Sequence, residues 1–277
     1  MKKIFIFLLF VYLIYIFIFN KQIVYSLSLV SDIYFNRYLV SLFPFILFTN
    51  LLLKTNVIID LHKFFYLHKK LYIFDVVIIF LVILIGIPGN INLLNYLFDS
   101  NIINKKEKEN YINYFGGISF PFIYLVLLSQ SHKKYLIILL LLLVELTMYL
   151  FSYQKQERER EYKYNIIKID VIKQTGYSLL VILFSLLAFS SLTALISNQD
   201  PFFVFIKGLI EFSYNCLLLS KSNTIVSTLL LTFIISFSSL SLVVQIKSID
   251  PSFKIFSYLK KRAFCALFVT LLTFLFL

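Results

Sequence analysis

The chain has 277 residues, of which 60% are hydrophobic and 18% aromatic, and its mean hydropathy is +0.88. A soluble domain of this size does not bury so much apolar side chain, so the composition predicts an all-α, polytopic membrane protein. The net charge is +12, but the basic residues are scattered among short loops. This distribution argues against a nucleic-acid partner and is typical of loops that set membrane topology.

The first apolar run covers residues 4–19 and follows Lys2 and Lys3, as the core of a signal peptide would. It ends without the small residues of a cleavage site. We therefore expect residues 1–29 to hold a retained N-terminal transmembrane helix.

A second apolar segment, residues 36–53, contains a proline near its middle. Proline removes one helical hydrogen bond and clashes with the preceding turn, and the two flanking pieces are each too short to cross a membrane. We expect a re-entrant hairpin here that enters and leaves on one side. Its polar or helix-breaking residues are Ser41, Pro44, Thr49 and Asn50.

Residues 58–71 mix apolar and basic side chains, a pattern typical of a helix that lies in the membrane interface. The segment includes His62 and His68, but no third ligand is nearby. We therefore expect no metal site.

Two apolar segments, 71–98 and 112–129, flank a polar turn at 99–111 and contain Gly/Pro breaks. In lipid, a broken helix persists only where other protein groups or a water-lined cavity take up the freed backbone groups. Broken helices are therefore a sequence pointer to the substrate site of a transporter, although ordinary kinks are an alternative because glycine and proline are common in membrane helices. The candidate site residues from these breaks are Gly86, Pro88, Asn90, Ser119 and Pro121.

A further apolar segment, 135–153, contains Glu145, which a basic residue of another helix could neutralise and which we leave outside the site. The next residues, 154–175, include the run Gln-Glu-Arg-Glu-Arg-Glu and predict a solvated, helical linker between two halves.

The second half repeats the organisation of the first. A helix at 176–197 precedes a short apolar run at 202–219, a long segment at 224–246 and a final helix at 262–277. A spanning helix, a short polar-containing piece and a long helix with small or polar residues occur in each half. This order predicts two pseudo-symmetric halves, as in transporters built from repeats.

Glu211 is the strongest single candidate, because an ionisable residue among apolar neighbours in a membrane is costly and is a functional hypothesis by default. Lys207 and Asn215 lie four residues to either side of it, so a continuous helix would place all three on one face. The alternative is a structural pair of Lys207 and Glu211.

A polar stripe is predicted on the long segment of the second half, where serines and a glutamine are spaced three and four residues apart. The stripe could bind substrate or form helix–helix hydrogen bonds, which small polar residues often provide in membranes. Asn90 has a similar pair of alternatives, a helix cap or a binding group. The candidate residues of the polar stripe are Ser238, Ser239, Ser241 and Gln245.

Several of these motifs occur together in one known family. Gly86-Ile87-Pro88, the Lys/Glu-rich turn at 105–109 and the run Ser119 to Phe122 are followed by Gly208-Leu209-Ile210-Glu211-Phe212-Ser213 and by Phe237 to Gln245. In this order they resemble the sporulation integral membrane proteins of the YlbJ type. That family carries the nucleoside-recognition (Gate) domain and is related to concentrative nucleoside transporters. The resemblance covers roughly residues 30–277 and implies Gate-like halves at 30–153 and 176–277.

The resemblance implies a transporter of a small organic anion, dipicolinic acid, in a mother-cell or forespore membrane of a bacterium, with membrane lipid as its surroundings. Half-helix N-termini at the breaks would favour an anion, and Glu211 suits proton or cation coupling, or a gate. No enzyme motif is present, so neither catalysis nor a cofactor is expected. The alternatives are a nucleoside-type transporter and a non-transporting envelope assembly or scaffold protein.

Overall fold

The computed structural model describes residues 2–152, 170–194, 196 and 200–277. Within these ranges every regular element is a helix and no strand occurs. By length and composition, four helical segments can cross a membrane, which is the coarse architecture that the composition predicts. They are Asn20–Lys54, Lys134–Ser152, Val171–Thr193 and Ile225–Ile249. The predicted charge run at 156–161 lies outside the described residues.

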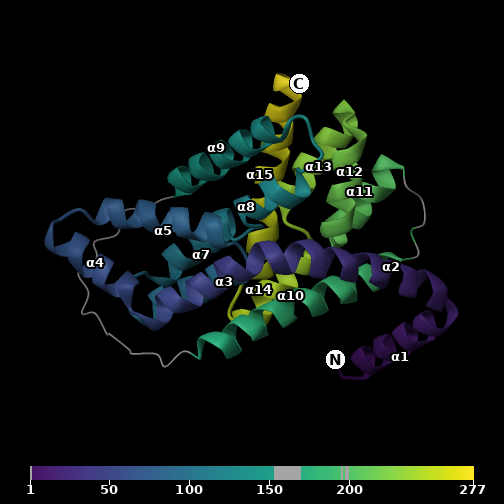
Figure 1. Cartoon of the computed structure of the whole chain (residues 1–277), viewed down its shortest axis with the longest axis horizontal. Helices are drawn as coiled ribbons and strands as arrows, with labels where there is room; N and C mark the ends of the chain where they lie inside the picture. Colours follow the sequence, from purple (N-terminus) through teal and green to yellow (C-terminus); the bar gives the residue numbers. More distant parts are fainter. Residues whose placement is uncertain (1, 153–169, 195, 197–199) are drawn as a thin grey trace.

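After its first helix, the N-terminal part of the chain forms one long helical rod. After α1 (Lys2–Ile18), the rod consists of α2 (Asn20–Ile33), the π-helical turn η1 (Tyr34–Tyr38) and α3 (Leu39–Lys54). Figure 1 shows α10 (Val171–Thr193) lying alongside this rod, and α10 contacts both α2 and α3.

The prediction of a re-entrant hairpin in this region is wrong, because Pro44 lies inside α3 without interrupting it. Proline costs a helix one backbone hydrogen bond, and the packing of α3 against α10 favours the continuous rod. Asn50 contributes to that packing, since its Nδ2 donates to the Thr175 hydroxyl of α10 at 2.9 Å. Ser41 and Thr49 donate to backbone carbonyls of their own helical turn.

The predicted interfacial helix corresponds to α4 (Val57–Leu67), which folds back on α5 (Leu71–Ile85). His62 of α4 is buried, and its ring meets the Phe74 ring edge-on with centroids 4.8 Å apart. His62 is therefore a packing residue within this helix pair.

The rest of the first half consists of interrupted helices. The predicted polar turn at 99–111 is mostly helical, because Asn104 and Glu107 form a capping box that starts a helix at Lys105. The elements in this region are α6 (Gly89–Asp99), α7 (Lys105–Phe115), α8 (Phe120–Phe122), the π-helical turn η2 (Ile123–Leu127) and α9 (Lys134–Ser152).

The second half begins inside the predicted linker, because α10 starts at Val171 and the Asp170 side chain accepts from the Lys173 N–H at 3.2 Å. The final helix also starts earlier than the sequence predicts and is longer. The remaining elements are α11 (Pro201–Ile210), α12 (Ser213–Ser222), α13 (Ile225–Phe237), α14 (Leu240–Ile249) and α15 (Ile255–Phe276).

One order of elements occurs twice along the chain. Each time, one interrupted helix is followed by a turn and then by a second interrupted helix. The first occurrence runs from α5 to α8 and the second from α11 to α14. In Figure 1, α13 and α15 stand together and cross the rod and α10 at a steep angle. The side chains at the breaks are buried, as Asn90, Ser119, Glu211 and Ser238 show.

An ion pair fixes the loop between α14 and α15 to the first half. Lys108 Nζ of α7 lies 2.7 Å from Asp250 Oδ2, and both side chains are about nine-tenths buried. Burial acts to raise the pKa of Asp250, but hydrogen bonds from Lys108 and Ser252 and the charge of Lys108 outweigh it and hold the pKa below its ordinary value.

Candidate functional site

The two breaks of the first half touch each other. Gly86 has φ +67°, and a Cβ there would lie only 2.5 Å from the backbone nitrogen of Ser119, so this close approach requires glycine. The Ile87 N–H donates to the Gly117 carbonyl at 3.2 Å. Each break therefore satisfies part of the backbone that the other one exposes.

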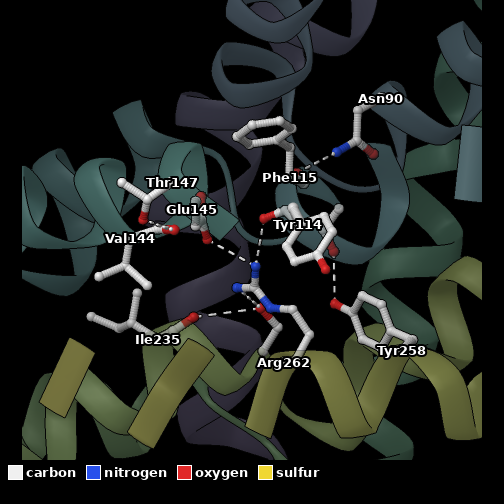
Figure 2. A network of polar contacts seen from close by, with 11 residues as sticks. Asn90, Tyr114, Phe115, Val144, Glu145, Thr147, Ile235, Tyr258 and Arg262 are labelled. Carbon is white, nitrogen blue, oxygen red and sulfur yellow. Dashed lines mark hydrogen bonds and ion pairs between the residues drawn. The ribbon is translucent and has the colours of Figure 1, made fainter. Parts of the chain in front are cut away.

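The end of α7 exposes carbonyl groups that have no helical donor, and side chains of other helices supply the donors. The Tyr114 carbonyl accepts from Arg262 Nη1 at 2.8 Å, and the Gly116 carbonyl accepts from the Tyr258 hydroxyl at 2.7 Å. Between them, the Phe115 carbonyl accepts from Asn90 Nδ2 at 3.4 Å (Figure 2).

Asn90 is thus held by a structural contact, and it does not cap its own helix. Its Oδ1 is buried with no hydrogen-bond partner in the described part of the chain, as is the hydroxyl of Ser119. Pro121 lies in the first turn of α8, after Ser119. The structure therefore places all five first-half candidates at the two touching breaks, and two of them, Asn90 and Ser119, carry these buried polar atoms.

Arg262 connects this junction to the second half. Its side chain is 1% exposed, and Figure 2 shows its guanidinium between Tyr114 of α7, Glu145 of α9 and Ile235 of α13. Nη1 donates to Glu145 Oε1 of α9 at 2.8 Å, and Nη2 donates to the Ser238 hydroxyl at 2.8 Å. Arginine suits such a site because its planar fork can serve several acceptors at once.

Sequence reasoning missed Arg262 because it follows two lysines and resembles the basic flank of a membrane helix. The available signal was Glu145, a carboxylate in an apolar helix that needs a cationic partner. The structure confirms that Glu145 pairs with a basic residue of another helix.

The continuous polar stripe predicted for the second half is wrong. Ser238 has φ +64° and ends α13, and α14 starts at Leu240, so helical spacing does not carry across the break. Ser239 and Ser241 share a hydrogen bond at 2.8 Å, whereas Gln245 Nε2 donates to the Ser185 hydroxyl of α10 at 2.7 Å.

Breaks from both halves nevertheless meet around one small cavity. Its lining includes Ile87 and Ser119 from the first half, Phe212 and Gln245 from the second half, and Tyr38 of the N-terminal rod. The volume is about 10 Å³, close to the minimum for one water molecule. The junction is therefore closed in this conformation.

Glu211 lies at a break of its own, between α11 and α12, with φ −137° and ψ 117°. The prediction that Lys207, Glu211 and Asn215 share one face of a continuous helix is therefore wrong. Glu211 Oε1 accepts from the Ser213 N–H at 2.7 Å, and Asn215 Nδ2 donates to the Glu211 carbonyl at 2.7 Å. Lys207 Nζ donates to the Ile196 carbonyl at 3.0 Å.

These residues still share a cavity, because the break turns them toward a space between α2, α10 and α11–α12. The volume of this space is about 190 Å³. One cation and one carboxylate face it, together with several amides and hydroxyls that can donate or accept hydrogen bonds. The described polar residues that line it are Gln22, Tyr25, Ser26, Ser190, Thr193, Lys207, Glu211, Tyr214 and Asn215.

Chemically, this polar cavity can bind a small charged solute. The Lys207 ammonium is a compact positive charge that can attract an anion, and the surrounding hydroxyl groups can donate further hydrogen bonds to that anion. Glu211 is 1% exposed, and a buried carboxylate in a membrane protein is costly unless it is paired or takes up a proton.

No family model, no curated protein and no solved structure matches the chain.

Proposed function

We propose that the protein is a membrane transporter that moves a small organic anion, by resemblance dipicolinic acid, across a sporulation membrane of a bacterium. The observation that carries this proposal is the polar cavity of about 190 Å³ at the break between α11 and α12. A cavity with a lysine, a buried carboxyl and a set of hydroxyl groups is unusual in a helical membrane protein, where polar groups mark binding sites and pathways.

In this mechanism Lys207 attracts the anion, and Ser26, Ser190 and Thr193 hydrogen-bond to it. Glu211 is the coupling group. A charged Glu211 would repel an anion in the same cavity, whereas a protonated one would not. Entry of the anion together with a proton therefore avoids the repulsion and leaves the cavity near neutrality.

The broken helices would allow the conformational change that transport requires. The repeated order of interrupted helices in α5 to α8 and α11 to α14 fits two pseudo-symmetric halves that rock against each other. The small cavity of about 10 Å³ that joins Ile87, Ser119 and Gln245 would then be the closed gate between them. Opening it would expose the unpartnered Asn90 and Ser119 oxygens to the pathway.

The test is a flux assay with the purified full-length chain in proteoliposomes, using labelled dipicolinate, other small carboxylates and nucleosides. We expect carboxylate uptake that a proton gradient drives and that Lys207→Gln reduces at least tenfold, roughly one lost charge contact. Glu211→Gln should keep anion exchange but lose accumulation against a gradient. Lys221→Gln, an exposed lysine at the end of α12, is the matched control.

Other outcomes would favour the alternatives. Nucleoside flux without carboxylate flux would assign the protein to the nucleoside-type transporters. A folded protein with no flux of either class, and variants at Lys207 and Glu211 with unchanged phenotype, would favour the scaffold.

A further inference from the structure

A third cavity forms a groove between α9 and α15, apart from the two described above. Its volume is about 620 Å³. Met148 and Phe151 of α9 form one wall, and Phe264 and Leu267 of α15 form the other. Lys260 and Lys261 lie at one end of the groove. It therefore combines a basic end with an apolar body.

The residues of α15 in this groove follow helical spacing. Lys260, Phe264 and Leu267 are separated by four and three residues, so they lie on one face of the helix. The exposed apolar stripe continues through Leu271 to Phe274. From Phe264 to Phe274 the stripe extends about 15 Å, which is about the hydrocarbon thickness of one bilayer leaflet.

The basic end is held in place by the protein. Lys261 Nζ lies 3.5 Å from Asn110 Oδ1 and 5.2 Å from the centre of the Tyr114 ring, while Lys260 is exposed. These contacts keep the Lys261 ammonium at the mouth of the groove and leave the Lys260 ammonium accessible beside it. Two neighbouring ammonium groups at the head of an apolar groove complement a phosphate that carries an acyl chain.

We propose that this groove binds one anionic phospholipid, with its phosphate headgroup at Lys260 and Lys261 and one acyl chain along Phe264 and Leu267. Basic pockets between membrane helices favour anionic headgroups. A free phosphate would contact the lysines but leave the apolar walls of the groove uncovered. The basic end together with the apolar walls therefore favours a lipid as the ligand.

The lipid would lie next to the Arg262 network without entering it. Tyr114 and Cys265 line the groove, and the Tyr114 carbonyl accepts from Arg262 on the inner side. A lipid in the groove would therefore cover the seam between α9 and α15, across which Glu145 and Arg262 pair.

The experiment is native mass spectrometry of the full-length chain released from detergent with phosphatidylglycerol or phosphatidylcholine of identical acyl chains. We expect the wild type to retain phosphatidylglycerol preferentially. In the double variant Lys260→Gln/Lys261→Gln, the preference for phosphatidylglycerol over phosphatidylcholine should fall about twenty-fivefold, at roughly fivefold for each lysine. Lys69→Gln/Lys70→Gln removes another pair of adjacent lysines, exposed in the α4–α5 turn, and should behave as the wild type.

Two further experiments distinguish binding of a whole lipid from binding of its phosphate headgroup alone. Leu267→Trp fills the apolar part of the groove and should reduce retention while both lysines remain. Inorganic phosphate and glycerol phosphate should not displace the bound lipid. Equal retention of the two lipids by the wild type, an equal loss in the Lys69/Lys70 control, unaffected retention in Leu267→Trp, or displacement by inorganic phosphate would each overturn the proposal. Circular dichroism establishes that the variants are folded.

Discussion

Replacing Arg262 with methionine removes the cation at the centre of the broken helices and keeps much of the apolar stem. Three acceptors then lose a donor: the Glu145 carboxylate, the Tyr114 carbonyl and the Ser238 hydroxyl. Removing one partner of a buried ion pair costs about 3–5 kcal/mol, because the other charge remains buried. The unsatisfied carbonyl adds about 1–3 kcal/mol. We expect Arg262→Met to lower the free energy of unfolding by about 4–8 kcal/mol.

The double variant Arg262→Met/Glu145→Leu removes both charges and leaves two neutral acceptors, the Tyr114 carbonyl and the Ser238 hydroxyl, without the Arg262 donor. It should therefore be more stable than Arg262→Met by about 3–5 kcal/mol, although it carries one more substitution. A second substitution that restores stability shows that the single variant is destabilised by an unpaired buried charge, because a general loss of packing would only increase with the second substitution.

Two buried free cysteines, Cys216 and Cys265, provide the assay. They become reactive to a thiol-specific fluorophore when the protein unfolds, so titration with a denaturing detergent gives the free energy of unfolding for each variant. Glu145→Leu alone completes the double-mutant cycle. A double variant no more stable than Arg262→Met, with a coupling energy near zero, would refute this account of the network.

Three further results are expected from the same measurement. Gly86→Ala should lose at least about 1–3 kcal/mol, because its φ of +67° and the nearby Ser119 backbone leave no room for a Cβ; unchanged stability would show that the two breaks do not touch. Pro44→Leu should leave the free energy of unfolding unchanged or raise it, since α3 is continuous there and leucine restores one backbone donor. A large loss of stability would favour the re-entrant hairpin instead. The Lys108–Asp250 pair should stabilise the protein at neutral pH and cease to do so as the pH falls through the lowered pKa of Asp250, below its ordinary 3.8. Asp250→Asn should flatten that acid-side dependence, and a variant with the wild-type profile would exclude the pair as its cause.

The sequence predicts the helical membrane class and the first pair of breaks for sound reasons. Apolar runs identify the helices, and Gly86 and Pro88 punctuate a helix whatever surrounds them, as Gly116 and Gly117 do. Local residue types are sufficient at these positions, because the conformational preference belongs to the residue itself.

Other features depend on partners far along the chain. Pro44 is compatible with both a hairpin and a continuous helix, and contact with α10 decides between them. Ser238 and Ser239 are not helix breakers by composition, but the break exists where Arg262 binds Ser238. The cavity around Glu211 likewise needs the approach of α2 and α10, which spacing within α11 and α12 does not specify.

The pairing of Glu145 with Arg262 also has a consequence for biosynthesis. The two residues are 117 positions apart, and Arg262 belongs to the last helix of the described chain. At about 5–20 residues per second, α9 would be synthesised on the order of 10 s before its partner. During that interval Glu145 is a lone carboxyl in an apolar helix, so the nascent chain carries an ionisable group without its partner until α15 has been synthesised.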